Sequence, residues 1–146
     1  MEHYGESGLT AESSARNLSV FGPRYMRDPK VSIVILHLDS RAALLACLKS
    51  CRTIQYSNYE IIIVENGSRV ALAPDALRDC AGRAPSVIRS PVNLGFAGGN
   101  NLGIRAALAQ GADYVLLLSD DTEVAPEFLD ALVQAGEQDE HIGALG

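Results

Sequence analysis

The sequence predicts an α/β fold in which a parallel sheet is flanked by helices. From Val31 onward, short apolar runs alternate with amphipathic segments, which is the pattern of a βαβ series. Polar or glycine-rich residues follow each predicted strand, whereas the opposite connections carry no comparable cluster. The chain has 146 residues, 47% of them hydrophobic, which is enough for one domain with a buried core.

The first half of the sheet is predicted from two apolar runs. Residues 31–37 (VSIVILH) form the first strand and residues 60–64 (EIIIV) the second. Between them, Ser40 is placed as the N-cap of a helix that runs to about Thr53. Its buried stripe has helical spacing and comprises Leu44, Cys47, Leu48 and Cys51. Both cysteines are interpreted as small core residues, because the chain has three cysteines and an odd number argues against a disulfide framework.

The second half follows after a turn at residues 65–68 (ENGS). Pro74 begins a short helix that Gly82 could end, and residues 86–90 (SVIRS) form a third strand. A glycine-rich loop at 91–99 leads into a helix from Asn100 to about Gln110. Residues 114–118 (YVLLL) are the fourth strand, and a helix beginning at Pro126 covers 126–137. Residues 141–146 (HIGALG) resemble the start of a further strand, so we expect the fold to be truncated.

The predicted domain covers residues 30–146, preceded by a flexible N-terminal arm at 1–29 that lacks periodicity. A net charge of −6 and a pI near 4.9 argue against nucleic acid as a partner. No apolar window is long enough for a transmembrane segment. We therefore expect a cytoplasmic protein, with peripheral association at the inner membrane face as a further option.

Ligands of open parallel sheets bind outside the carboxyl ends of the strands. Asp120 and Asp121 lie there, directly after the fourth strand, and could hold Mg²⁺ or Mn²⁺ together with phosphate oxygens of a substrate. Alternatively, Asp120 or Thr122 caps the helix that begins near Pro126, and Glu123 favours its dipole. The position alone does not choose between a cation site and a helix cap.

The other strand ends carry weaker signals. Glycines in the segment NLGFAGGNNLG let the backbone approach a ligand, or they form a tight turn with Asn100 as N-cap. Glu65 could accept a hydrogen bond from a base imide or a ribose hydroxyl, or be a solvated turn residue. His37 and Asp39 follow the first strand, and for Asp39 a plain turn residue is the favoured interpretation.

Five motifs in order carry a family resemblance: VSIVILHLDS, CLKSC, YEIIIVENGS, NLGFAGGNNLGI and YVLLLSDDTEV. From Val31 to Gly146 the chain resembles the inverting family 2 glycosyltransferases, especially the rhamnosyltransferase-like branch. The resemblance implies a Rossmann-like GT-A nucleotide-sugar-binding half, a dTDP- or UDP-sugar donor and a DXD-type metal site. It assigns Asp121 to the metal, Asp120 to the ribose and Glu65 to the base. The remaining donor-binding positions are His37, Asn93, Gly95, Gly99 and Asn100.

This chain departs from the family pattern at several positions. The family usually has aspartate at Glu65, often an aromatic-Asn pair where residues 37–39 are HLD, and in many members arginine at Gly99. The family's aspartate general base would lie beyond Gly146, so no catalytic residue is assigned here.

The predicted function is sugar transfer with inversion to a glycan or lipid-linked acceptor, in cell-surface polysaccharide or glycoconjugate synthesis. Two alternatives remain: a nucleotide-binding module without turnover, and a nucleotidyltransferase of similar topology. The nucleotidyltransferase would ordinarily need basic residues near the triphosphate, and the glycine loop has none before Arg105.

Overall fold

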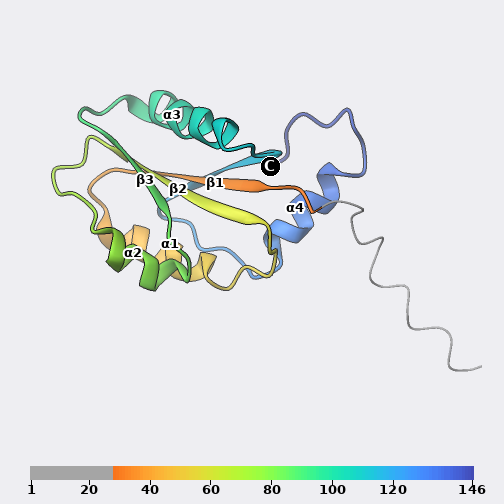
Figure 1. Cartoon of the computed structure of the whole chain (residues 1–146), viewed down its shortest axis with the longest axis horizontal. Helices are drawn as coiled ribbons and strands as arrows, with labels where there is room; N and C mark the ends of the chain where they lie inside the picture. The colour runs from red at the N-terminus through yellow and green to blue at the C-terminus, as the bar shows by residue number, and fades with distance from the viewer. Residues whose placement is uncertain (1–27) are drawn as a thin grey trace, which may run out of the picture.

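The computed structural model describes residues 28–146 and shows a four-stranded parallel sheet with helices on both faces (Figure 1). The elements are β1 (Val31–His37), α1 (Arg41–Cys51), β2 (Tyr59–Asn66), α2 (Pro74–Ala81), β3 (Ser86–Ser90), α3 (Gly95–Ala109), β4 (Tyr114–Ser119) and α4 (Phe128–Gly136). The strand order is β3-β2-β1-β4, so the order reverses between β1 and β4. The predicted α/β class is confirmed. Residues 1–27, nearly all of the predicted arm, lie outside the described part.

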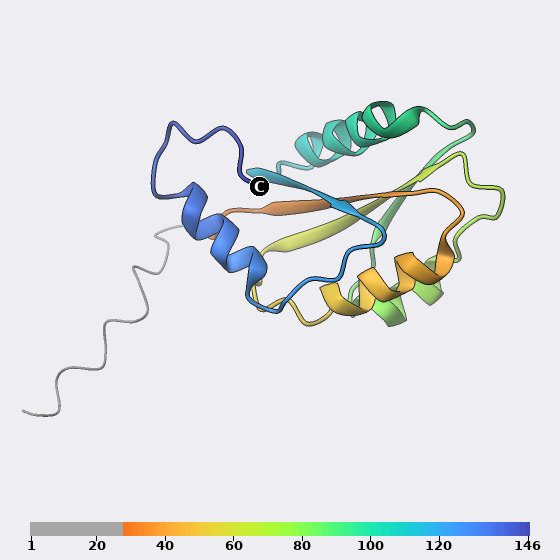
Figure 2. The same cartoon turned by 180° about the vertical axis from the view of Figure 1, so that it is seen from behind.

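The sheet separates two apolar layers. Helix α3 covers one face, and α1 and α2 cover the other, as the two opposite views show (Figures 1 and 2). On the α1 side, Ile33 and Ile35 of β1 pack with Leu48 of α1 in the larger cluster. On the α3 side, Val34 belongs to a smaller cluster with Ala107. Burial on both faces explains why the central strands are continuous apolar runs rather than alternating ones.

Helix α3 lies unusually close to the sheet. A Cβ atom at Gly103 would lie 2.3 Å from Val34 Cγ1, and one at Gly99 would lie 2.3 Å from Leu36 Cδ1. Both distances are far below van der Waals contact, so only glycine fits at these two positions without a shift of the helix or the strands. These two glycines therefore set the distance between α3 and the ends of β1 and β2.

Two predicted boundaries in the second half of the chain were wrong. Helix α3 begins at Gly95 rather than Asn100, so the glycine-rich segment supplies its first turns. Helix α4 begins at Phe128, after a turn at residues 126–127. The glycines suggested a loop, but contacts with the sheet, described below, stabilise the helical conformation there.

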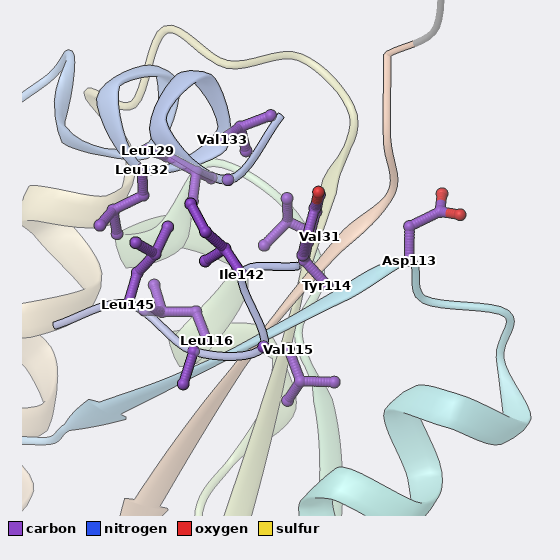
Figure 3. Close-up of a pocket in the computed structure, with 13 residues that line it drawn as sticks. Val31, Asp113, Tyr114, Val115, Leu116, Leu129, Leu132, Val133, Ile142 and Leu145 are labelled. Atoms are coloured by element: carbon purple, nitrogen blue, oxygen red, sulfur yellow. The ribbon is translucent and has the colours of Figure 1, made fainter. Parts of the chain in front are cut away.

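The predicted strand at residues 141–146 was also wrong, because this segment has no regular secondary structure. It turns back toward β4 and α4, where it lines a cavity of about 330 Å³. Figure 3 shows Ile142 and Leu145 pointing toward the apolar side chains of β4 and α4. Ile142 and Leu145 are three residues apart, so they would not point to the same face of a strand. Gly143 lies between them and Gly146 follows them, and glycine is unfavourable inside a strand.

Candidate functional site

Four side chains form a row across the carboxyl ends of the strands. His37 of β1 is paired with Glu65 of β2, and Glu65 is paired with Arg89 of β3. In the parallel register of β1 with β4, Leu36 is paired with Ser119, so the next residues, His37 and Asp120, lie side by side. We call these residues, in the order Asp120, His37, Glu65 and Arg89, the ionisable row. It lies on the side of the sheet that α1 and α2 cover, because each member is two residues beyond a residue of that apolar layer.

His37 and Asp120 are joined across the point where the strand order reverses. The His37 Nδ1 and Asp120 Oδ2 atoms are 2.8 Å apart, and His37 is only 2% exposed. A buried imidazole that donates from Nδ1 fixes the orientation of the carboxylate it touches. The sequence predicted both residues as donor-binding positions, and the structure brings them into contact.

Glu65 is buried and its two carboxylate oxygens have partners within the protein. It is 2% exposed. Its Oε1 accepts the backbone N–H of Leu72 at 2.5 Å, and its Oε2 lies 3.7 Å from Arg89 Nε. The carboxylate therefore anchors a segment that follows β2 and is not a solvated turn residue.

Asn66, the next residue along β2, points to the α3 side of the sheet and holds the segment that precedes α3. Its Oδ1 accepts the N–H of Leu94 at 2.9 Å. Its Nδ2 donates to Asn93 Oδ1 at 3.0 Å and to the Gly95 carbonyl at 3.1 Å. Sequence reasoning treated Asn66 only as part of a turn. Strand alternation could have identified it. Successive side chains of a strand point to opposite faces of the sheet, so Asn66 faces away from Glu65, toward the side on which the glycine-rich segment lies.

Of the remaining predicted residues of this segment, Gly95 is exposed, whereas Gly99 and Asn100 are buried. Gly95 has φ of 72°, a left-handed conformation that favours glycine, and its N–H is bound by Asn93 Oδ1 at 2.8 Å. Asn100 is buried within α3 and donates to the Phe96 carbonyl at 3.0 Å, so it is not an N-cap. Gly99 is buried against Leu36 and Asn66.

A cavity of about 510 Å³ opens on the α3 side of the strand ends. This volume lies within the range of roughly 300–1,000 Å³ that is typical of small-molecule sites. Asp120 and Ser119 line one part of it, and the exposed side chains of Leu38 and Phe96 supply apolar surface. The full lining is Leu36, Leu38, Asn66, Asn93, Gly95, Phe96, Asn100, Leu117, Leu118, Ser119 and Asp120. We call this space the donor cavity, after the expectation from the family resemblance that a nucleotide-sugar donor binds at the strand ends.

A second cavity, of about 320 Å³, includes His37 in its lining together with residues 69–72. Asp39 shapes its rim from the left-handed region, with φ of 58°. One Asp39 oxygen accepts the Arg69 N–H at 2.9 Å, and the other pairs with Arg69 Nε at 3.0 Å. The backbone hydrogen bond from Arg69 is the main reason why the pKa of Asp39 is lowered. Asp39 therefore joins the loop after β1 to the loop after β2.

Asp121 is the residue that best fits a cation ligand. It is exposed beside Asp120, and its Oδ1 accepts the Ser119 hydroxyl. Among residues 28–146, no three His, Cys, Asp or Glu side chains converge into a metal-binding group. Mg²⁺ does not require such a group, since one or two carboxylates and substrate phosphates commonly suffice. The alternative, that Asp120 or Thr122 caps the next helix, was wrong: Glu127 occupies the N-cap of α4.

Comparison with known proteins gives a consistent family assignment. The sequence profile described as Glycosyl transferase family 2 matches residues 32–146. An uncharacterised glycosyltransferase of Haemophilus influenzae is 30% identical over 115 residues, which cover 79% of this chain and 37% of that protein. An uncharacterised protein of Mycobacterium tuberculosis is 44% identical over 43 residues, or 30% of this chain and 16% of that one.

Solved structures share the fold at low sequence identity. S. aureus TarS 1-349 in complex with UDP-GlcNAc superposes with a TM-score of 0.65 at 17% identity, over 76% of this chain and 32% of that one. The mannosyltransferase PcManGT from Pyrobaculum calidifontis, in complex with GDP-Man and Mn²⁺, gives 0.64 at 19% identity, over 75% and 32%. The present chain thus spans about a third of the length of these proteins. In the described residues, no helix is long and apolar enough to cross a membrane.

Proposed function

The chain belongs to glycosyl transferase family 2, and we propose that its described residues bind the nucleoside-diphosphate-sugar donor of a glycosyltransferase in the donor cavity. The observation that carries this proposal is the pair of adjacent carboxylates at the reversal point of the sheet. Asp120 is held by His37 and lines the cavity, and Asp121 is exposed next to it. Ligands of open α/β sheets bind at this position.

The cavity offers a different surface to each part of such a donor. The exposed side chains of Leu38 and Phe96 suit the flat faces of a nucleobase. Asp120 suits the ribose, because a carboxylate oxygen has more than one lone pair and can accept a hydroxyl while His37 holds the group in place. The diphosphate would then lie toward Asp121.

A diphosphate beside two carboxylates requires a counter-charge. The protein carries a net charge of −6, and the glycine-rich segment contains no basic residue before Arg105. Asp121 would hold Mg²⁺ or Mn²⁺ with its carboxylate, the hard oxygen ligand that these cations prefer. When bound, such a cation neutralises the charge that develops on the leaving diphosphate.

For the whole protein, we propose transfer with inversion from a dTDP- or UDP-sugar to the hydroxyl of a glycan or lipid-linked acceptor, as in the rhamnosyltransferase-like branch. The product would belong to a cell-surface polysaccharide or glycoconjugate. We place the reaction in the cytoplasm, at the inner membrane face if the acceptor is lipid-linked. In this arrangement Asp120 and Asp121 would lie on the side of the leaving diphosphate, and Glu65 is buried against Leu72, so we assign the general base to none of the three.

Titration calorimetry with UDP, dTDP and GDP, with and without Mn²⁺, tests the proposal. We expect binding only with the cation, and a loss of at least about tenfold in affinity in Asp121→Asn because a primary ligand is removed. Glu123→Gln is the matched control, since it removes one exposed negative charge two residues away. Binding without metal that is unchanged in Asp121→Asn would refute the assignment.

A further inference from the structure

Glu65 is the residue at which the family pattern and this structure differ most clearly. The resemblance implies an acid that contacts the nucleobase, usually an aspartate. Here the carboxylate is a glutamate, is 2% exposed, and accepts the Leu72 N–H at 2.5 Å. Glu65 is absent from the lining of the donor cavity, whereas Leu38 and Asn66 line it, so a nucleobase in that cavity would meet those side chains rather than this carboxylate.

The length of the side chain explains why a glutamate stands here. An aspartate carboxylate would lie about 1.5 Å closer to the β2 backbone, the length of one carbon–carbon bond. A retreat of that size from the present 2.5 Å would take the oxygen beyond the roughly 3.2 Å limit of an N–H···O hydrogen bond unless the loop moved with it. The extra methylene of Glu65 therefore serves the contact with Leu72.

The segment that Glu65 anchors is residues 68–72, which closes the smaller cavity beside His37. Its other end is held separately. Asp39 binds the Arg69 N–H, the Ser68 hydroxyl accepts the Asp39 N–H at 3.3 Å, and Arg89 Nη2 lies 3.5 Å from the Ser68 carbonyl. Asp39 holds only the Ser68–Arg69 end, and at the other end the Glu65 hydrogen bond acts together with the packing of the Leu72 side chain in the apolar core.

His37 connects this segment to the donor cavity. It lines the smaller cavity together with Leu72, it is level with Glu65 in the β1–β2 register, and its Nδ1 holds Asp120. A displaced Leu72 would open one side of His37 and loosen the hydrogen bond that orients Asp120. Glu65 would thus act on the donor through three residues: Leu72, His37 and Asp120.

We propose that Glu65 is a positioning residue for donor binding, which fixes the 68–72 segment through Leu72 and makes no direct contact with the nucleobase. This inference rests on the proposed function and makes it more specific. It assigns base recognition to groups other than the acid at the end of β2.

Two conservative variants distinguish positioning from direct contact. Glu65→Gln keeps the side-chain length and an acceptor oxygen for Leu72, whereas Glu65→Asp keeps the charge and loses the reach. We expect the Kd for UDP with Mn²⁺ to stay within about threefold in Glu65→Gln and to rise at least about tenfold in Glu65→Asp, since a neutral oxygen still accepts the N–H. The amide of Leu72 should exchange its hydrogen faster in Glu65→Asp only.

A direct base contact makes the opposite prediction, because the family's own aspartate would then bind at least as well. Wild-type affinity in Glu65→Asp, with the Leu72 amide still protected, overturns the inference and leaves the proposed function intact. Failure of the wild-type chain to bind UDP, dTDP and GDP with metal overturns both.

Arg89→Gln provides a second variant in case Glu65→Asp does not fold. It removes the 3.7 Å ion pair and leaves the contact between Glu65 and Leu72. Unchanged UDP affinity supports the inference. A tenfold loss in this variant, with the Leu72 amide still protected, would show that the ion pair matters instead.

Discussion

Replacing Asn66 by aspartate tests how the donor cavity is held together. The substitution keeps the shape of the side chain and the Oδ1 acceptor for Leu94, but it exchanges the amide group for a second oxygen. Two donated hydrogen bonds are lost, to Asn93 Oδ1 at 3.0 Å and to the Gly95 carbonyl at 3.1 Å. Asn66 is 3% exposed, so water cannot easily replace the lost donors.

The loss in the free energy of unfolding can be estimated from these contacts. Each hydrogen bond contributes about 1 kcal/mol, and each buried polar group left unpaired costs roughly 1–3 kcal/mol. Because the Asn93 oxygen retains the Gly95 N–H at 2.8 Å, we count one unpaired group rather than two. The free energy of unfolding should therefore fall by about 3–5 kcal/mol near neutral pH. The loss should shrink in acid, since a protonated carboxyl can donate one of the two bonds.

Urea unfolding followed by circular dichroism measures this change, and calorimetry with UDP and Mn²⁺ measures the effect on the site. Asn101→Asp is the control, because Asn101 is exposed on α3 and the same exchange there should change stability by no more than about 0.5 kcal/mol. We also expect weaker UDP binding in Asn66→Asp, because Asn93 and Gly95 line the donor cavity. If Asn66→Asp matches the control in both stability and affinity, the amide does not hold the segment before α3.

Two further predictions concern stability. Gly103→Ala should lower the free energy of unfolding by up to about 2 kcal/mol, because overlap with Val34 costs roughly 1–3 kcal/mol and the better helix propensity of alanine returns about 1 kcal/mol. A stabilised variant in urea unfolding would contradict the close packing of α3. The lowered pKa of Asp39 means that its contribution is present above the unfolded value of 3.8 and is lost as the pH falls through the lower folded value. Asp39→Asn should therefore be less stable than wild type at neutral pH and equal to it in strong acid, and a constant difference across the pH range would exclude this titration.

The strands were predictable because each one is encoded by a short, continuous run of apolar residues. Runs such as residues 31–37 and 59–66 are apolar on both sides, and a fully buried parallel strand needs that pattern. The start of α3 was not predictable in this way, since glycines disfavour helix when the chain is considered alone. Contacts from a distant strand reverse that preference: Asn66 binds the residues before the helix, and Gly99 and Gly103 allow it to lie against the sheet.

The candidate site was predictable residue by residue but not as an arrangement. His37 and Asp120 were found because both follow strands. Their contact depends on β4 lying beside β1, which the order of elements along the chain does not reveal. Asn66 was missed because the sequence around it suggested only a turn, and its role appears once α3 is placed over that face of the sheet.

Three of the departures from the family pattern gather on one side of the site. His37, Asp39 and Glu65 all lie on the side of the smaller cavity, and each is held by a side-chain contact, with Asp120, Arg69 and Leu72 respectively. By contrast, Asn93, Gly95 and Asn100, which were predicted for donor binding, line the donor cavity on the α3 side. If the donor occupies that cavity, Leu38 is the departure that lines it, whereas His37, Asp39 and Glu65 lie one layer behind. Substitutions in that layer should then alter donor affinity through the orientation of Asp120 rather than through lost contacts with the nucleotide.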